Sequence, residues 1–167
     1  SPHNPNWGGI EMRMVAPIEI GICCTDLEKL RNFYVDVLGC TAVNDIEVPA
    51  DKSRQAALAN NGYRVARLQT PWGERLKLLQ PVLSPETATS TEWILSRRGL
   101  SYITFIVDDL KAIIARLKTA GVTFLTGTDR VEVRPGTFLS FIRDPEGNVL
   151  EFVEYSDIRE YRADLGR

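Results

Sequence analysis

The sequence predicts an α+β fold made of two βαβββ modules, whose sheets form a curved open surface around a cavity with the helices on the outer face. Residues 19–27 (EIGICCTDL) and 102–110 (YITFIVDDL) lie 83 residues apart, and each combines an apolar run with an acidic helix start. Residues 70–80 (TPWGERLKLLQ) and 144–154 (DPEGNVLEFVE) repeat at an offset of 74. One such half would leave a sheet face uncovered, so the halves are expected to pack together or against a second chain.

The first half begins with a strand and a helix. Residues 18–24 alternate between apolar and other side chains, which predicts a half-buried strand. Thr25 and Glu28 suggest a capping box around Asp26. Apolar residues then recur at helical spacing as far as Gly39, where the helix is expected to end.

A hairpin and a linker follow. Residues 63–69 and 75–80 predict two strands joined by a turn that contains proline and glycine. Residues 81–98 are polar and contain two prolines, which is typical of a connector, and one helical turn is expected around Trp93.

The second half repeats this order. Residues 102–107 predict the strand, Asp108 or Asp109 the helix N-cap, and Gly121 the helix end. The matching hairpin is predicted at residues 137–143 and 148–155. The whole chain thus divides into a flexible arm (1–14), a first module (15–80), a linker (81–98), a second module (99–156) and a C-terminal tail or short helix (157–167).

Composition favours a soluble globular protein. Hydrophobic residues make up 44% and charged residues 25% of the chain, both near average. The net charge of −2 gives no electrostatic reason to expect nucleic acid or a membrane as partner. Three cysteines, two of them adjacent, are a poor disulfide framework, and the apolar N-terminal run is too short for a signal sequence or membrane span. We therefore expect a cytoplasmic protein.

Strand periodicity divides the side chains between a face under the helices and a face that lines the cavity. The cavity face is predicted to contain Glu19, Gly21, Cys23, Val65, Arg67, Gln69, Lys77, Leu79, Tyr102, Thr104, Ile106, Leu139, Phe141, Arg143, Glu151 and Val153. Six of these are predicted to bind a ligand: Cys23, Arg67, Gln69, Thr104, Phe141 and Arg143.

Two arginines are the best candidates for holding an anionic ligand group, because a guanidinium forms bidentate bonds to carboxylate or phosphate. These are Arg67 and Arg143, with the alternative that each is an ordinary surface arginine. Phe141, with Trp72 or Trp93, could supply an aromatic wall or simply pack.

Cys23 could act as a nucleophile, but a packed cysteine is the more frequent case and no histidine is available to activate it. Cys24 is expected in the core on the helix side. The one histidine of the sequence, His3, falls in the predicted arm, where a solvated side chain is the usual case.

Three segments give the chain a family resemblance: TDLEKLRNFYVDVLG, VDDLKAIIARLKTAGV and RDPEGNVLEF. In this order and duplication they resemble the vicinal oxygen chelate superfamily, which includes glyoxalase I, methylmalonyl-CoA epimerase, extradiol dioxygenases, fosfomycin-modifying enzymes and bleomycin-binding proteins. The resemblance covers about residues 17 to 156, nearly the whole chain. It implies the paired βαβββ fold. The expected partners are a small-molecule ligand or substrate and a second copy of the chain in a homodimer.

Metal-holding members of that superfamily place His, Glu or Gln, His and Glu at four cavity positions. The resemblance carries these positions onto Glu19, Lys77, Tyr102 and Glu151, of which only Glu151 has the usual ligand type. The ammonium of Lys77 has no lone pair and brings a positive charge to the place of the ion. No cofactor is therefore expected, with a divalent metal as the alternative.

The same four residues are the candidate catalytic group. Lys77 could be an internal cation between Glu19 and Glu151, with the Tyr102 hydroxyl bonded to a carboxylate, or it could extend into solvent. Such a group could also transfer a proton next to a carbonyl, although charge networks are more often structural.

The function predicted from the sequence is binding or transformation of a small organic molecule in a cleft without a standard metal site. Whether the protein is an enzyme stays open; a lyase or isomerase of the glyoxalase type that lacks the usual histidine ligands is one reading. The alternatives are a metal-dependent lyase, isomerase or dioxygenase, and a non-catalytic structural dimer.

Overall fold

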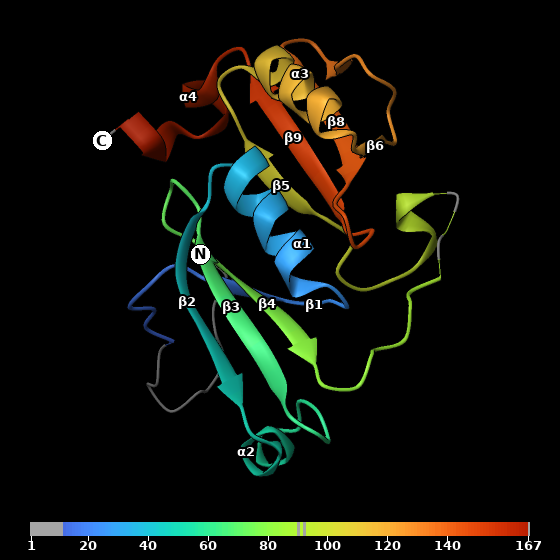
Figure 1. Ribbon diagram of the computed structural model, residues 1–167. Coiled ribbons are helices and arrows are strands. Elements are labelled where there is room, and N and C mark those ends of the chain that lie inside the picture. The colour runs from blue at the N-terminus through green and yellow to red at the C-terminus, as the bar shows by residue number, and fades with distance from the viewer. Residues whose placement is uncertain (1–11, 90, 92, 167) are drawn as a thin grey trace.

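The computed structural model describes residues 12–89, 91 and 93–166, and it arranges their strands in two sheets (Figure 1). The strands of the first sheet are β1 (Glu19–Cys23), β2 (Thr41–Val48), β3 (Tyr63–Gln69) and β4 (Arg75–Pro81). Those of the second are β5 (Ile103–Ile106), β6 (Thr123–Phe124), β7 (Val131–Arg134), β8 (Thr137–Arg143) and β9 (Val149–Tyr155).

The two sheets have the same topology. The strand orders are β1-β4-β3-β2 and β5-β9-β8-β6, and β7 also pairs with β8. In each sheet the first strand runs parallel to the last one, while the other pairs are antiparallel. The prediction of an α+β fold with a repeated βαβββ order is confirmed.

The first helix lies in its predicted place but begins differently. The α-helix α1 (Leu27–Asn32) continues as a π-helical turn, η1 (Phe33–Val37), and the backbone reverses at Gly39 with a φ of +78°. The Asp26 side chain caps α1 by accepting from the Lys29 N–H at 3.1 Å. The predicted capping box of Thr25 and Glu28 is wrong, because those side chains bond to Glu146 and Arg64 instead.

The second helix follows the prediction more closely. Helix α3 (Leu110–Ala120) has Asp109 as its N-cap and Gly121, with a φ of +73°, as its C-cap. Each helix start is also tied to the last strand of its own sheet. The Gln80 side chain accepts from the Leu27 N–H, and the Glu154 side chain accepts from the Leu110 N–H, both at 2.8 Å. The internal repeat thus extends to individual hydrogen bonds.

One buried cluster of apolar side chains includes residues from both halves. The phenol of Tyr34 in η1 donates to the Asp144 carboxylate at 2.8 Å, across the junction of the two halves. The Glu146 carboxylate accepts from the backbone N–H groups of Thr25 and Asp26. The halves are therefore joined through α1, η1 and the β8–β9 turn.

Four short helical segments complete the described chain. They are α2 (Ala50–Gln55), which the sequence reading missed, the 3₁₀ turn η2 (Ile94–Ser96) next to Trp93, α4 (Ile158–Tyr161) and the 3₁₀ turn η3 (Ala163–Gly166). None of the helices in the described part of the chain has the length and apolar character needed to cross a membrane. His3 and residues 1–11 of the predicted arm lie outside the described residues.

Candidate functional site

Three rows of side chains cross the first sheet on the face opposite α1. Strand register places them in order across β1, β4 and β3. The rows are Glu19, Arg75 and Gln69; Gly21, Lys77 and Arg67; and Cys23, Leu79 and Val65. We call these nine residues the first half-site.

The middle row of the first half-site is positively charged. Lys77 and Arg67 are directly paired across β4 and β3, and Gly21 on the other side of Lys77 has no side chain. Arg67 donates to the amide oxygen of Asn44 at 3.2 Å, while half-buried Lys77 makes no hydrogen bond or ion pair with any residue that the structure describes. The two cations thus lie side by side without a carboxylate partner.

A matching surface lies on the second sheet, and we call it the second half-site. Its middle row is Thr104, Glu151 and Phe141, paired across β5, β9 and β8. The Thr104 hydroxyl donates to the Glu151 carboxylate at 2.7 Å. The Tyr102 ring, 46% exposed, meets the Phe141 ring edge to face with centroids 5.2 Å apart. This half-site combines one carboxylate with an aromatic pair.

The remaining candidate residues differ in how far neighbouring groups engage them. Arg143 lies in the second half-site, where its guanidinium donates to the Gly147 carbonyl at 2.9 Å. Gln69 accepts from the Arg75 guanidinium at 3.1 Å. Trp72 and Trp93, proposed for an aromatic wall, are both largely exposed, the first in the β3–β4 turn and the second before η2.

The Lys77-centred network is not formed in this structure. Within residues 12–89, 91 and 93–166, neither a hydrogen bond nor an ion pair links Lys77 to Glu19 or Glu151, and the Tyr102 hydroxyl bonds to neither carboxylate. Glu151 bonds within its own half-site, and Glu19 is exposed at the start of β1. The structure therefore groups the four candidate catalytic residues into two pairs, one in each half-site.

The cysteines are poorly suited to nucleophilic chemistry. Cys24 and Cys40 are buried, as was predicted for Cys24, and burial raises the pKa of Cys24 to about 12 and that of Cys40 to about 11. Burial and the nearby Glu146 carboxylate also raise the pKa of the more exposed Cys23 thiol. A raised pKa keeps the thiol protonated at neutral pH and so reduces its reactivity.

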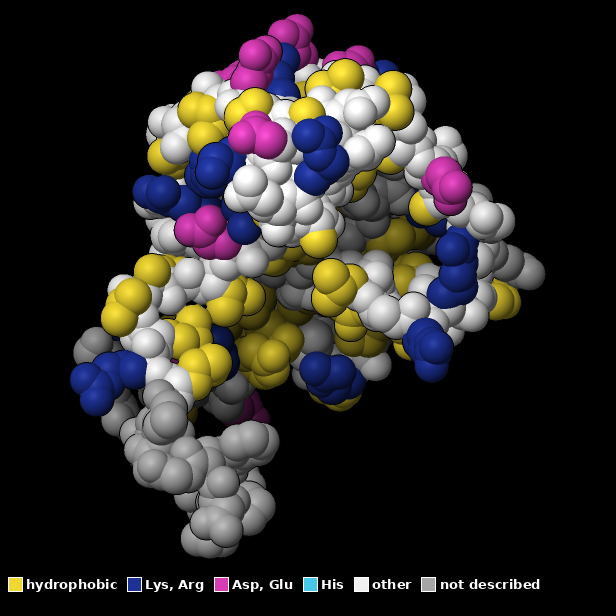
Figure 2. Space-filling model, turned by 90° about the horizontal axis from the view of Figure 1, so that it is seen from below, with side chains coloured by type: hydrophobic (Ala, Val, Ile, Leu, Met, Phe, Trp, Pro, Cys, Tyr) yellow, Lys and Arg dark blue, Asp and Glu magenta, His cyan; other side chains and the backbone are white. Residues whose placement is uncertain are grey.

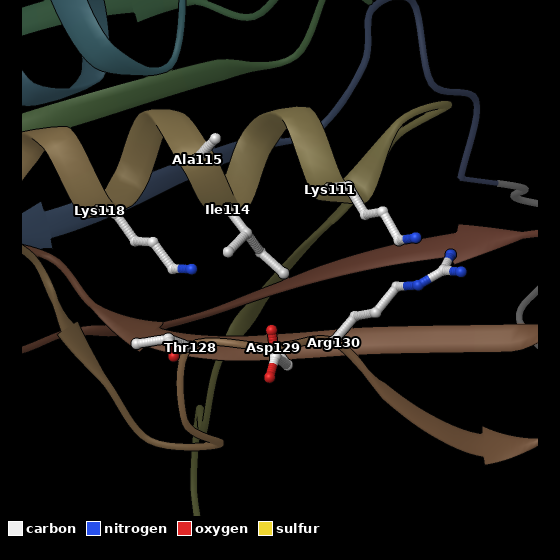
Figure 3. A pocket seen from close by; sticks show the side chains of 7 residues that line it. All are labelled: Lys111, Ile114, Ala115, Lys118, Thr128, Asp129 and Arg130. Atoms are coloured by element: carbon white, nitrogen blue, oxygen red, sulfur yellow. The ribbon is translucent and has the colours of Figure 1, made fainter.

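A separate pocket of about 340 Å³, which the sequence reading did not identify, lies between α3 and residues 128–130 (Figure 3). Lys111, Ile114 and Lys118 line it from the helix, and Arg130 from the opposite wall. The Arg130 guanidinium is already engaged, since it pairs with Glu154 at 3.2 Å and lies 3.8 Å above the Phe138 ring. None of the half-site residues lines this pocket.

The surface also shows apolar side chains that the core does not cover. Seen from below, hydrophobic side chains gather around a hollow in the molecule (Figure 2). Exposed apolar residues of the linker include Val82, Leu83 and Leu95, and Leu100 just after the linker is exposed as well. Cavity-face residues such as Ile106 are also exposed. A continuous patch of exposed apolar side chains is typical of a face at which ligands or partners bind.

Comparisons with known proteins agree with this architecture. The family model of the Glyoxalase/Bleomycin resistance protein/Dioxygenase superfamily matches residues 16–152. The uncharacterized protein YaeR of Escherichia coli K12 is 30% identical over 135 residues, which span 81% of this chain and 92% of that protein.

Two solved structures are similar in fold. A glyoxalase family protein from Bacillus cereus gives a TM-score of 0.73 at 20% identity and covers 87% of this chain and 97% of its own. A glyoxylase/bleomycin resistance protein/dioxygenase domain from Frankia gives 0.63 at 20% identity, over 87% and 93% of the two chains. Similarity at this level of identity concerns the fold alone.

Proposed function

Because the chain belongs to the Glyoxalase/Bleomycin resistance protein/Dioxygenase superfamily, we propose that it binds a small organic molecule at its two half-sites and holds or transforms it without the metal site of metal-dependent relatives. The observation that carries this proposal is the position of Lys77. By the family resemblance it corresponds to a position at which metal-holding members have a ligand, and its ammonium has no partner among the described residues.

The donor set does not fit a divalent metal. Of the four positions, Glu19 and Glu151 offer carboxylate oxygens, Tyr102 offers a phenol, and Lys77 offers a cation without a lone pair. No group of three or more His, Cys, Asp or Glu side chains in the described part of the chain is arranged as a metal site. A structural or catalytic transition metal usually needs at least three such protein ligands.

The half-sites instead offer what a small-molecule site needs. Cations, a carboxylate, hydroxyl groups and an aromatic pair project from rigid strands, and exposed apolar side chains lie beside them. Burial and Glu146 raise the pKa of the Cys23 thiol and so disfavour its reactive thiolate, and covalent chemistry through Cys23 is therefore not part of the proposal. The proposed function covers both binding of the molecule alone and its turnover without a metal.

A panel of small carboxylates, phosphonates and neutral aromatic compounds, titrated with and without EDTA, tests the proposal. We expect saturable binding of at least one probe, unchanged by the chelator and mapped by NMR to residues of the half-sites. Binding that appears only with added divalent metal would support the metal-dependent alternative. No binding of any probe would support the non-catalytic structural dimer.

The proposal also includes a homodimer and a cytoplasmic location. Val82, Leu83 and Leu95 of the linker are strongly exposed, as is Leu100 just after it, and burial in an interface would remove their apolar surface from water. The three cysteines form no disulfide, which suits a reducing compartment. Light scattering that gives the mass of one chain at all concentrations would contradict the dimer.

A further inference from the structure

We infer, on the basis of the proposed function, that the ligand carries an oxyanion and an aromatic group at opposite ends. The oxyanion is a carboxylate, phosphate or phosphonate held by Lys77 and Arg67 of the first half-site. The aromatic group packs on Tyr102 and Phe141 of the second half-site. The ligand thus bridges the half-sites in one orientation.

The first step of the argument is the uncompensated charge in the middle row of the first half-site. Like charges placed directly opposite each other on neighbouring strands destabilise a sheet. Lys77 and Arg67 are such a pair, and the only side-chain partner of Arg67 among the described residues is the neutral amide of Asn44. An oxyanion bound to both cations would convert this repulsion into two attractive, charge-assisted contacts.

The second step is the contrast with the opposite face of the same sheet. There, Arg64 and Arg31 both pair with Asp45, at 2.6 and 2.9 Å, and Arg64 also reaches Glu28. On the half-site face, Arg67 and Arg75 bond to amide oxygens and Lys77 to nothing described. The one sheet therefore neutralises its cations on the helix side and leaves them available on the other.

The third step is the difference between the surroundings of the two rows. Gly21 lies next to Lys77, and the Leu79 side chain lies over it, since a Cβ added at Gly21 would be 3.2 Å from Leu79 Cδ1. The β1 side of Lys77 therefore offers apolar surface and no carboxylate. The equivalent row of the second half-site has Glu151, which would repel an oxyanion, and Phe141. The Phe141 ring meets the Tyr102 ring, and this pair suits an aromatic group. The two half-sites thus select different ends of one molecule.

Three probes test the inference: phenylacetate, phenylphosphonate and the uncharged phenylacetamide, each titrated into the full chain in the presence of EDTA and followed by NMR. We expect phenylacetate and phenylphosphonate to shift half-site resonances and to bind at least about tenfold more tightly than phenylacetamide. This ratio corresponds to about 1.4 kcal/mol.

Variants identify the cation that is responsible. Lys77→Met keeps the apolar stem and removes the charge, and it is expected to weaken phenylacetate about tenfold while leaving phenylacetamide unchanged. Arg67→Gln serves as the second variant, with the same expected result. Lys118→Met, in the pocket of Figure 3, is the matched control and is expected to change neither affinity.

The outcomes separate this inference from the proposed function. Equal affinity for phenylacetate and phenylacetamide at the half-sites overturns the oxyanion assignment but leaves small-molecule binding intact. Loss of phenylacetate binding in Lys118→Met but not in Lys77→Met moves the anion site to the other pocket and also overturns the assignment. If none of the three probes binds but another compound of the panel does, the inference fails and the proposed function stands; if no compound of the panel binds, both fail.

Discussion

The hydrogen bond from Tyr34 to Asp144 offers the sharpest test of how the two halves hold together. Both side chains are buried, and the phenol oxygen lies 2.8 Å from the carboxylate. Tyr34→Phe removes the hydroxyl and keeps the ring. A hydrogen bond to a charged group contributes about 1.5–3 kcal/mol, and in a chain of this size about 1 kcal/mol shifts Tm by about 2–4 °C. We therefore expect Tm to fall by about 3–12 °C.

The assay is thermal and urea unfolding, with Tyr63→Phe as the control, because the Tyr63 hydroxyl makes none of the hydrogen bonds found among the described residues. The pH dependence supplies a second readout. Burial and Asp144 raise the pKa of Tyr34 well above its ordinary value of 10.0. The hydroxyl therefore contributes stability that is complete below pH 10 and declines as the pH rises further.

The difference in unfolding free energy between wild type and Tyr34→Phe should accordingly narrow above pH 10. The reasoning is refuted if Tyr34→Phe is as stable as Tyr63→Phe at neutral pH. It is also refuted if the two halves unfold in separate transitions in the wild type, because the shared core and this hydrogen bond predict a single one.

Three further predictions concern single residues. Gly62 and Gly147 share a φ of +90°, but a Cβ added at Gly62 would lie 2.7 Å from the Val48 carbonyl oxygen, whereas one added at Gly147 would meet nothing. Urea unfolding should therefore show that Gly62→Ala lowers the free energy of unfolding by at least about 1 kcal/mol more than Gly147→Ala does. Equal losses of stability in the two variants would contradict the clash. Cys23 should react with iodoacetamide more slowly than a free thiol at pH 8, because its pKa is raised; faster labelling in a mass-spectrometric time course would count against that shift. The Arg64 hydrogen bond lowers the pKa of Asp45 below 3.8. The difference in unfolding free energy between wild type and Asp45→Asn should therefore be constant above pH 4 and shrink as the pH falls through the lowered pKa. A difference that does not change at acidic pH would contradict the pairing.

Much of the fold could be predicted because the sequence pattern of the βαβββ module occurs twice in the chain. The repeated strand and helix starts identified both modules, and strand alternation placed Cys24 in the core and Lys77 on the opposite face. Helix α2 was missed because its six residues carry no apolar period. The prediction of the capping box was wrong because the Thr25 hydroxyl donates to Glu146, which is 121 residues away in the sequence and could not be identified from local spacing.

The candidate site was predictable only in part, because residues distant in the sequence decide which partners its side chains have. Alternation gives the face of a side chain but not the partner of its charged end. Nothing in the local sequence shows that Thr104 bonds to Glu151, or that the Arg143 guanidinium turns to the Gly147 carbonyl. That Lys77 has no partner among the described residues likewise depends on contacts between strands, which alternation alone does not give.

The metal content of the protein tests the central claim most directly. The protein, purified without a histidine tag, is incubated with zinc, nickel, manganese and iron(II), desalted, and analysed by inductively coupled plasma mass spectrometry beside a Glu151→Ala variant. With an ammonium at the place of the ion, the metal content should stay far below one atom per chain and be the same in both proteins. One tightly held atom per wild-type chain, absent from Glu151→Ala, would contradict the account.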